Sequence, residues 1–303
     1  MPSPAAPVFS PLAGTRVLSL ALNLPGPAAL MRCHAMGAQC VKFEPLAPRG
    51  GSADPMSVYA PEAYDAMHDG IGCLQGDLKT DEGQALLQIE LACADVLITS
   101  FRPSALAKLG LGWDALHARY PRLSMVAIVG APGAQAEAPG HDLSYMAESG
   151  LVTGAELPPT LYADMGGSLM ASEAVLQALL HRATHGSGVR IEVALSEAAH
   201  YLALPRHWGL TTPGGTVGGA HAGYRVYPCR DGRVALAALE PHFAQRLCAA
   251  AGLDAEAAQA MFRSSTHAAI AAFVATQDCA ALEALALAHD VPLHAMRDAV
   301  SAD

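Results

Sequence analysis

Three short segments of this sequence carry side chains whose types and spacing could do chemistry. Residues 140–145 read Gly-His-Asp-Leu-Ser-Tyr, residues 163–167 read Ala-Asp-Met-Gly-Gly, and residues 239–243 read Leu-Glu-Pro-His-Phe. Each places an ionisable side chain near glycine or proline, where a loop can present it and the backbone can approach a ligand closely. A histidine, an aspartate and a glutamate that meet in a fold can move protons at a carbon centre. His141, Asp164 and Glu240 are therefore the candidate catalytic residues.

Each candidate also has an ordinary structural interpretation. A single histidine after glycine is commonly a surface or hydrogen-bonded loop residue. Asp164 would most simply cap the helix that follows it, a role that is compatible with catalysis. Glu240 would be a solvated carboxylate at a helix start, and Asp142 and Tyr145 would hold the loop around His141.

Composition excludes several classes of protein. With 303 residues, 52% of them hydrophobic and 15% charged, the chain can bury a large core and is expected to divide into two domains. No uninterrupted apolar run is long enough to cross a bilayer, so no membrane contact is expected. A net charge of −10 weighs against a nucleic-acid surface, since such binding depends on clustered Lys and Arg.

Cysteine and histidine usage bears on the compartment and on metals. The cysteines are odd in number, widely scattered and without a C-x-x-C pair, which indicates reduced thiols in the cytoplasm. Residues 1–10 contain no basic region followed by an apolar stretch, so no secretory signal is expected. His181 and His185 have the spacing of two metal ligands on a helix, but before Gly186 they are better explained as cations at a helix C-terminus. We expect no metal site.

Elements that alternate between strand and helix must position the candidate residues. Apolar, β-branched runs predict strands over residues 15–20, 40–43, 94–99 and 123–129, the last two nearly continuous in apolar residues. Helices are predicted over residues 28–36, from the Thr80 cap to about Leu91, and from Ser104 onward. This order is typical of an α/β fold with a parallel sheet.

The second half of the chain has a different pattern. A long helix is predicted over residues 166–184 and a strand over residues 190–195. Residues 204–222 are rich in glycine and proline and resemble a linker. A hairpin is predicted from residues 223–227 and 233–238 around Asp231-Gly232, with alanine-rich helices from there to the end. We therefore expect domains at residues 1–203 and 223–303, joined by residues 204–222.

Several motifs in colinear order resemble the class III CoA-transferase (CaiB/BaiF) family, which includes acyl-CoA racemases. They are residues 11–18, 37–45, 76–83 and 94–103, then His141, Asp164, residues 186–198 and residues 223–243. The resemblance implies a Rossmann-like large domain, a smaller α+β domain and an interlocked homodimer with its active site between the large domain of one chain and the small domain of the other. Glu240 would then act across the dimer interface.

The resemblance also implies a ligand. The substrate would be an acyl-CoA thioester, with no metal and no dissociable redox cofactor, because CoA belongs to the substrate. Gly166 and Gly167 would leave room for the acyl group, and the Asp142 N–H would face the enolate oxygen. The other residues implied to contact substrate or CoA are Lys42, Lys79, Arg102 and Tyr145.

Within the family, the histidine at position 141 separates two chemistries. Racemases of α-methylacyl-CoA resemble this chain at His141, Asp164 and Glu240: the His and the Asp exchange protons with opposite faces of the α-carbon, and the Glu orients the imidazole. CoA transferases share the aspartate, which attacks the thioester, and usually lack the histidine. The expected function is racemisation of a 2-methylacyl-CoA; a transferase with Asp164 as nucleophile and a non-catalytic relative stay open.

One departure from the family pattern concerns CoA binding. Residues 69–76, Asp-Gly-Ile-Gly-Cys-Leu-Gln-Gly, contain no cation where the family usually carries a basic run. An unusual thioester or weaker CoA binding would fit this difference.

Overall fold

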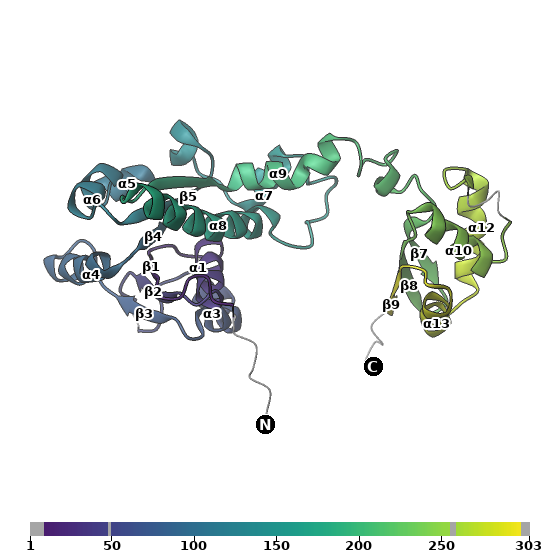
Figure 1. Cartoon of the computed structure of the whole chain (residues 1–303), viewed down its shortest axis with the longest axis horizontal. Coiled ribbons are helices and arrows are strands. Elements are labelled where there is room, and N and C mark those ends of the chain that lie inside the picture. The colour runs from purple at the N-terminus through teal and green to yellow at the C-terminus, as the bar shows by residue number, and fades with distance from the viewer. Residues whose placement is uncertain (1–8, 48–49, 255–258, 298–303) are drawn as a thin grey trace, which may run out of the picture. The chain divides into compact units, whose positions relative to one another are not determined.

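A computed structural model of the chain describes residues 9–47, 50–254 and 259–297, and divides the chain into two compact units (Figure 1). The first is Met1–Ala203 and the second is Leu204–Asp303. Residues 1–8, which include most of the segment inspected for a secretory signal, and residues 298–303 of the predicted small domain lie outside the described residues. The expected linker begins inside a helix, because α9 (Leu195–His207) continues through Pro205.

The first unit is built on a six-stranded parallel sheet. Its spatial order is β3-β2-β1-β4-β5-β6. In chain order the strands are β1 (Arg16–Ser19), β2 (Gln39–Glu44), β3 (Gly72–Gln75), β4 (Val96–Thr99), β5 (Ser124–Val129) and β6 (Arg190–Ala194). Every residue of β5 is buried, as its continuous apolar sequence predicted for a strand covered on both faces.

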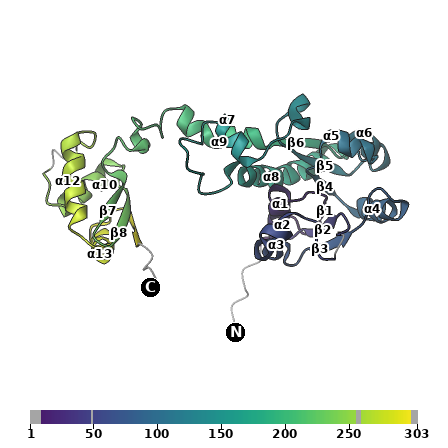
Figure 2. The ribbon, with the colours of Figure 1, turned by 180° about the vertical axis from the view of Figure 1, so that it is seen from behind.

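Helices cover both faces of this sheet. On one face α1 (Pro25–Ala35) and α8 (Tyr162–His185) lie side by side in both views (Figures 1 and 2) and pack on Val17, Ile98 and Val126. On the other face α4 (Asp81–Cys93), α5 (Pro103–Lys108) and α6 (Trp113–Arg119) cover Leu18, Leu97 and Met125. The remaining elements of the unit are α2 (Met56–Tyr59), α3 (Pro61–His68), α7 (Asp142–Glu148) and the short helix η1 (Gly133–Glu137).

Local sequence signals explain several helix boundaries. The Thr80 hydroxyl oxygen accepts a hydrogen bond from the Gly83 N–H at 3.1 Å, which confirms the predicted cap of α4. Helix α1 begins at Pro25, earlier than predicted, because proline is well suited to the first turn. Helix α8 ends where Gly186 adopts a φ of +78°, the left-handed conformation that glycine accepts without strain.

The second unit pairs a small antiparallel sheet with helices. Its strands, in the order β7-β8-β9, are β7 (Tyr224–Cys229), β8 (Gly232–Ala237) and β9 (Leu293–Arg297), and its helices are α10 (Pro241–Ala250), α12 (Ser264–Ala275), α13 (Cys279–His289) and η2 (Thr216–Gly218). The hairpin was predicted. The expectation of helices to the end of the chain is wrong, because β9 pairs with β8 through Leu293 and Leu236. Five residues give too short a pattern to predict a strand whose partner lies far away in sequence.

The helices were also compared with the requirements of a membrane span. In the described part of the chain no single helix is long and apolar enough to cross a bilayer, and one bent pair, α12 with α13, meets the length and composition criteria together.

A buried cluster of charges lies at the carboxyl end of β2. The Lys42 ammonium contacts Glu44 Oε1 at 2.8 Å and Asp54 Oδ2 at 2.6 Å, and all three side chains are 0% exposed. Burial alone would raise the pKa of Glu44, but hydrogen bonds from Lys42, Ser52 and Tyr64 hold it below its usual value. The cluster also reaches the loop between β1 and α1, because Asp54 accepts a hydrogen bond from the Asn23 N–H at 3.1 Å.

Replacing Lys42 by methionine should strongly destabilise the first unit, because two buried carboxylates would lose their counter-charge. We expect a loss of about 3–5 kcal/mol in the free energy of unfolding at pH 7, measured by urea denaturation. The loss should shrink as the pH falls through the usual range of carboxyl pKa values, where the carboxylates of the variant take up protons. Lys108→Met, at the exposed end of α5, is the control, and an equal loss in both variants would contradict the role of the cluster.

Candidate active site

The carboxyl edge of the parallel sheet collects the loops that carry the candidate residues. Each strand of a parallel sheet leaves the sheet at the same edge, and the neighbouring strands β1 and β4 continue into helices on opposite faces of this sheet. Arg102 follows β4, His141 follows β5, and Asp164 lies in the first turn of α8, which runs back to β6. Such a switch point is where open α/β sheets bind ligands.

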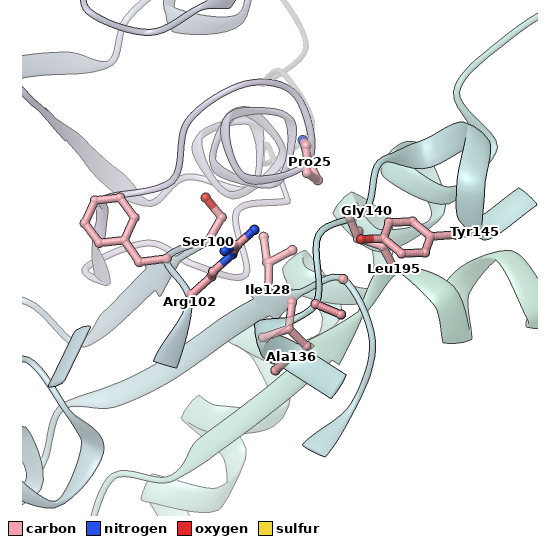
Figure 3. A pocket seen from close by; sticks show the side chains of 12 residues that line it. Pro25, Ser100, Arg102, Ile128, Ala136, Gly140, Tyr145 and Leu195 are labelled. Atoms are coloured by element: carbon pink, nitrogen blue, oxygen red, sulfur yellow. The ribbon is translucent and has the colours of Figure 1, made fainter. Parts of the chain in front are cut away.

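A pocket of about 160 Å³ opens at this edge (Figure 3). Figure 3 shows Ser100 and Arg102 on one side and Gly140 and Tyr145 on another, with Pro25 at the start of α1. The remaining lining is mostly apolar and comprises Phe101, Ile128, Val129, Gly130, Ala136, Ala138 and Leu195. The His141 and Asp164 side chains do not line it, but the neighbouring Gly140 and Tyr145 do.

His141 is held by the start of α7. Its backbone is extended, with φ −140°, and it occupies the N-cap position. Ser144 Oγ accepts a hydrogen bond from the His141 N–H at 3.1 Å and donates one to the His141 carbonyl at 2.6 Å. The His141 side chain itself is exposed, so its imidazole is accessible to a ligand.

Asp164 is a carboxylate in an unfavourable environment. Burial, and next the charge of Asp142, raise its pKa from 3.8 to about 6, although the neighbouring His141 acts in the opposite direction. Asp142 is itself buried and accepts a hydrogen bond from the Asp164 N–H at 3.0 Å. Asp142 thus ties the start of α7 to the start of α8, and the structure brings His141, Asp142 and Asp164 together.

The expected N-cap role of Asp164 is wrong. Helix α8 begins at Tyr162 with Leu161 as its N-cap, so Asp164 is the third helical residue. Its position in the first turn is still favourable for a negative charge, because free N–H groups point from that end of the helix.

Tyr145 and Arg102 both contribute to the pocket. Burial, and next the charge of Asp164, raise the pKa of Tyr145, so its hydroxyl stays protonated at neutral pH and can donate a hydrogen bond. In the described part of the chain the exposed Arg102 guanidinium makes no ion pair, so it is available to an anionic group of a ligand.

Gly166 and Gly167 were expected to leave room for an acyl group, but side chains of α9 occupy the space beside them. A Cβ atom at Gly167 would lie 2.2 Å from Leu195 Cδ2, and one at Gly166 would lie 3.0 Å from Leu202 Cδ1. Both glycines are buried against α9, so the absent side chains allow two helices to pack closely.

The two lysines expected to bind CoA have different surroundings. The expectation for Lys42 is wrong in this structure, because its ammonium is 0% exposed and is bound by Glu44 and Asp54, so it cannot reach a ligand. Lys79 is exposed in the loop after β3, where its N–H donates to Asp77 Oδ1 at 3.0 Å. Its CoA contact stays a prediction.

Glu240 lies in the second unit. It is exposed at the N-cap position of α10, its side chain does not cap the helix, and its carbonyl accepts a hydrogen bond from the Ala244 N–H at 2.9 Å. Its environment within that unit leaves the carboxylate free to act on another group.

Sequence reasoning missed two features. Asn23 adopts a φ of +64° just before the pocket residue Pro25, which is uncommon for a residue other than glycine, and Asp54 holds it there. Asn is one of the few residue types enriched in this conformation, but the sequence does not show where it occurs.

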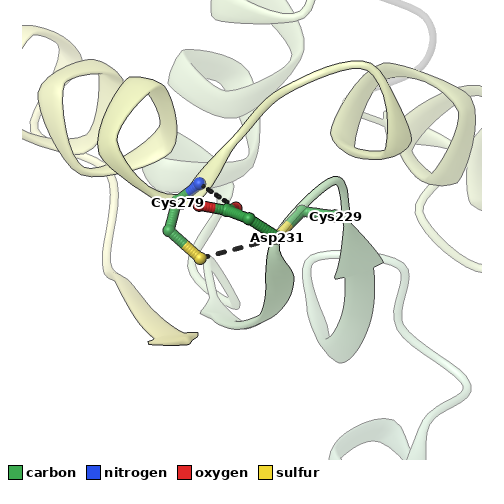
Figure 4. A group of neighbouring side chains, drawn as sticks. All are labelled: Cys229, Asp231 and Cys279. Carbon is green, nitrogen blue, oxygen red and sulfur yellow. Dashed lines mark hydrogen bonds between the residues drawn. The ribbon is translucent and has the colours of Figure 1, made fainter. Parts of the chain in front are cut away.

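In the second unit, Cys229, Asp231 and Cys279 form a cluster of the kind that can hold a metal ion (Figure 4). Neither cysteine has a nearby partner in sequence.

The family model for CoA-transferase family III matches residues 12–302 of the chain. Among curated proteins, a succinate–glutarate CoA-transferase of Agrobacterium fabrum is 30% identical over 81% of this chain and 67% of its own length. The alpha-methylacyl-CoA racemase of Mus musculus is 31% identical over 81% of this chain and 66% of its own length. A probable fatty acyl-CoA transferase of Mycobacterium tuberculosis is 31% identical over 65% of this chain and 53% of its own length, so the chain spans about half to two thirds of these relatives.

Solved structures agree with the fold. A crystal structure of a hypothetical protein from Mycobacterium tuberculosis superposes with a TM-score of 0.81 at 25% identity, covering 96% of this chain and 85% of that one. A CaiB/BaiF family protein from Brucella suis superposes with a TM-score of 0.77 at 24% identity over 96% and 85% of the two chains. With a family model that covers nearly its whole length, this chain belongs to CoA-transferase family III.

Proposed function

We propose that this protein racemises the α-carbon of a 2-methylacyl-CoA thioester by proton transfer through an enolate. The observation that carries the proposal is the neighbourhood of His141 and Asp164, in which the carboxyl pKa is raised to about 6. A group that both accepts and donates a proton works best when its pKa lies near the working pH. A racemase needs two such groups, one for each face of the α-carbon.

In the proposed reaction one of the two groups removes the α-proton and the other returns one. The imidazole of His141 takes the proton from one face, which leaves an enolate whose charge lies on the thioester oxygen. The Asp164 carboxylic acid donates its proton to the opposite face of the carbon, and the roles reverse for the other enantiomer. Because the pKa of Asp164 is raised to about 6, about a tenth of this carboxyl group is protonated at pH 7, far more than for an ordinary aspartate, and this fraction can act as the acid.

The enolate oxygen needs a donor of hydrogen bonds. The Asp142 N–H is at the first residue of α7, where no earlier helical carbonyl is available to it, and the protonated Tyr145 hydroxyl lies in the adjoining pocket. Arg102 would bind an anionic part of the CoA. No metal or redox cofactor is required, because the step is acid–base chemistry and CoA is part of the substrate.

We further propose that the working form is a homodimer in which Glu240 of one subunit orients His141 of the other. Helix α8 supports an interface: Leu161, Met165 and Leu169 recur every four residues and are 46%, 40% and 49% exposed. Apolar side chains aligned on one helical face are typical of a surface that another chain covers.

A CoA transferase with Asp164 as nucleophile is the second candidate, and the similarity to the Agrobacterium fabrum enzyme named for that activity favours it. The two candidates differ in what they require of His141. Acyl transfer through an Asp164 anhydride needs no proton transfer at the α-carbon, whereas racemisation does.

His141→Ala should abolish exchange of the α-proton of a 2-methylacyl-CoA in deuterated water. We expect wild-type exchange by NMR and a loss of at least about 100-fold in the variant, because it removes one of the two proton carriers. The fold of α7 should persist, since the two hydrogen bonds between Ser144 Oγ and the backbone of residue 141 do not need the imidazole. His185→Ala, at the exposed end of α8, is the matched control.

Transfer to a free acid that survives His141→Ala, fails in Asp164→Ala and yields a hydroxylamine-trapped intermediate would establish the transferase instead. The absence of exchange, transfer and thioester binding would identify a non-catalytic relative of the family.

Asp164→Asn should stabilise the fold at alkaline pH. The folded-state pKa of about 6 lies above the reference value of 3.8, so ionisation opposes folding, and the wild type loses stability as pH rises between these values. Above pH 7 the variant should be more stable by up to about 3 kcal/mol, and below pH 4 the difference should vanish. Urea denaturation at both pH values measures it, with the exposed Asp65→Asn as control. A difference independent of pH would refute the electrostatic cause.

Leu169→Glu should convert the proposed homodimer to monomers, because it places a charge in the apolar stripe of α8. Sedimentation velocity of wild type and variant at equal concentration measures the change. Ile89→Glu, on α4 and 62% exposed, should stay dimeric. A monomeric wild type would contradict both the interface and the role given to Glu240 of the second subunit.

A further inference from the structure

Two thiols from distant parts of the chain lie in contact within the second unit. Cys229 is the last residue of β7 and Cys279 the first residue of α13, 50 positions later, and their Sγ atoms are 3.6 Å apart (Figure 4). This is the contact distance of two unbonded sulfur atoms. The proposed racemisation uses neither of these two thiols.

The backbone around the two thiols keeps them together. In the turn between β7 and β8, the Arg230 N–H donates to the Gln277 carbonyl at 2.9 Å, and Asp231 Oδ1 accepts from the Cys279 N–H at 2.7 Å. The Arg230 guanidinium also pairs with Asp278, which caps α13 through the Ala281 N–H at 2.8 Å. The turn is therefore fixed to the start of α13 on both sides of the sulfur atoms.

The two thiols differ in access to solvent. Cys229 is half-buried, whereas Cys279 is 0% exposed. Burial, followed by its hydrogen bonds with Asp231 and Cys229, raises the pKa of Cys279 to about 12. A small reagent can therefore reach Cys229 first, and Cys279 is protected from direct attack. A disulfide carries no charge, so it suits the buried surroundings of Cys279 better than a thiolate does.

We propose that Cys229 and Cys279 form a reversible intramolecular disulfide by exchange with a small dissolved disulfide of the glutathione class. The Cys229 thiolate attacks one sulfur of that disulfide, whose S–S bond breaks and releases one thiol. Cys279 then loses its proton and attacks Cys229 Sγ in the mixed disulfide, which releases the second thiol. The dissolved disulfide is reduced to two thiols, the protein dithiol is oxidised, and its two protons pass to the released thiols.

A disulfide fits this cluster better than a metal ion. The described residues offer three ligand atoms here, with Asp231 as the third, whereas a structural zinc site has four. Asp231 Oδ1 already accepts a hydrogen bond from the Cys279 N–H. The positive Arg297 guanidinium interacts electrostatically with Asp231 and Cys279. A divalent cation would meet that positive charge, and a neutral S–S bond would not.

The bond would tie the β7–β8 turn to α13. Glu240 follows the opposite end of β8, so the disulfide forms away from the residue assigned to catalysis. Its expected effect is on stability, because a cross-link that closes a long loop restricts the unfolded chain. The oxidised protein should show a higher urea midpoint than the reduced protein.

Peptide mapping of the whole chain after equilibration with oxidised and reduced glutathione tests the proposal. We expect a peptide pair joined through Cys229 and Cys279 that disappears on reduction. Cys279→Ser should trap glutathione on Cys229, whereas Cys229→Ser should leave Cys279 unmodified because it is buried. Cys248→Ser, a buried thiol of the same unit, should keep the cross-link.

Three results would overturn the proposal. One is the absence of the cross-link under conditions that attach glutathione to the exposed Cys73 and Cys93. Another is equal trapping of glutathione at position 229 and position 279 in the two serine variants. A third is stoichiometric zinc binding by the reduced protein, lost in Cys229→Ser, Asp231→Asn and Cys279→Ser, with no disulfide formed.

Discussion

The parallel direction of the six strands is the constraint on which the rest of the first unit depends. Because the carboxyl ends of all six strands lie at the same edge, the loops that follow them converge there although they are far apart in the sequence. The reversal of strand order between β1 and β4 then opens the space that Arg102, Gly140 and Tyr145 line. Helix α8 runs antiparallel to the strands, so its first turn brings Asp164 to the same edge.

Asp164 shows how a fold can hold a group in a chemically useful but unfavourable state. Its carboxylate is partly removed from water and lies close to the negative charge of Asp142, yet the same Asp142 accepts its backbone N–H and keeps it in place. Structure that stabilises the backbone thus raises the energy of the ionised side chain. Active sites commonly combine these two effects, because proton transfer near neutral pH requires a carboxyl group that is less acidic than one in water.

The first unit contains both buried charged side chains, which pair with one another, and charged side chains that are exposed to solvent. Lys42, Glu44 and Asp54 are completely buried and join β2 to the backbone of Asn23, whereas Arg102 and Lys79 remain exposed at the carboxyl edge. A buried lysine with two carboxylate partners cannot exchange them for a ligand without a large cost in desolvation. The exposed cations have no such cost, and the pocket that Arg102 lines is largely apolar.

Much of this organisation is contained in the sequence. The alternation of apolar strands with capped helices predicted an α/β unit, Thr80 marked the start of α4, and the order of motifs identified the family, because these signals are local or colinear. Other features were decided only by the tertiary structure. The sequence predicted that Lys42 contacts CoA, but in the structure Glu44 and Asp54 bind its buried ammonium. Gly166 and Gly167 pack against α9. Strand β9 forms by pairing with β8. The physical reason is that burial, the pKa of a carboxyl group and strand pairing depend on atoms from distant segments, which a single sequence does not bring together.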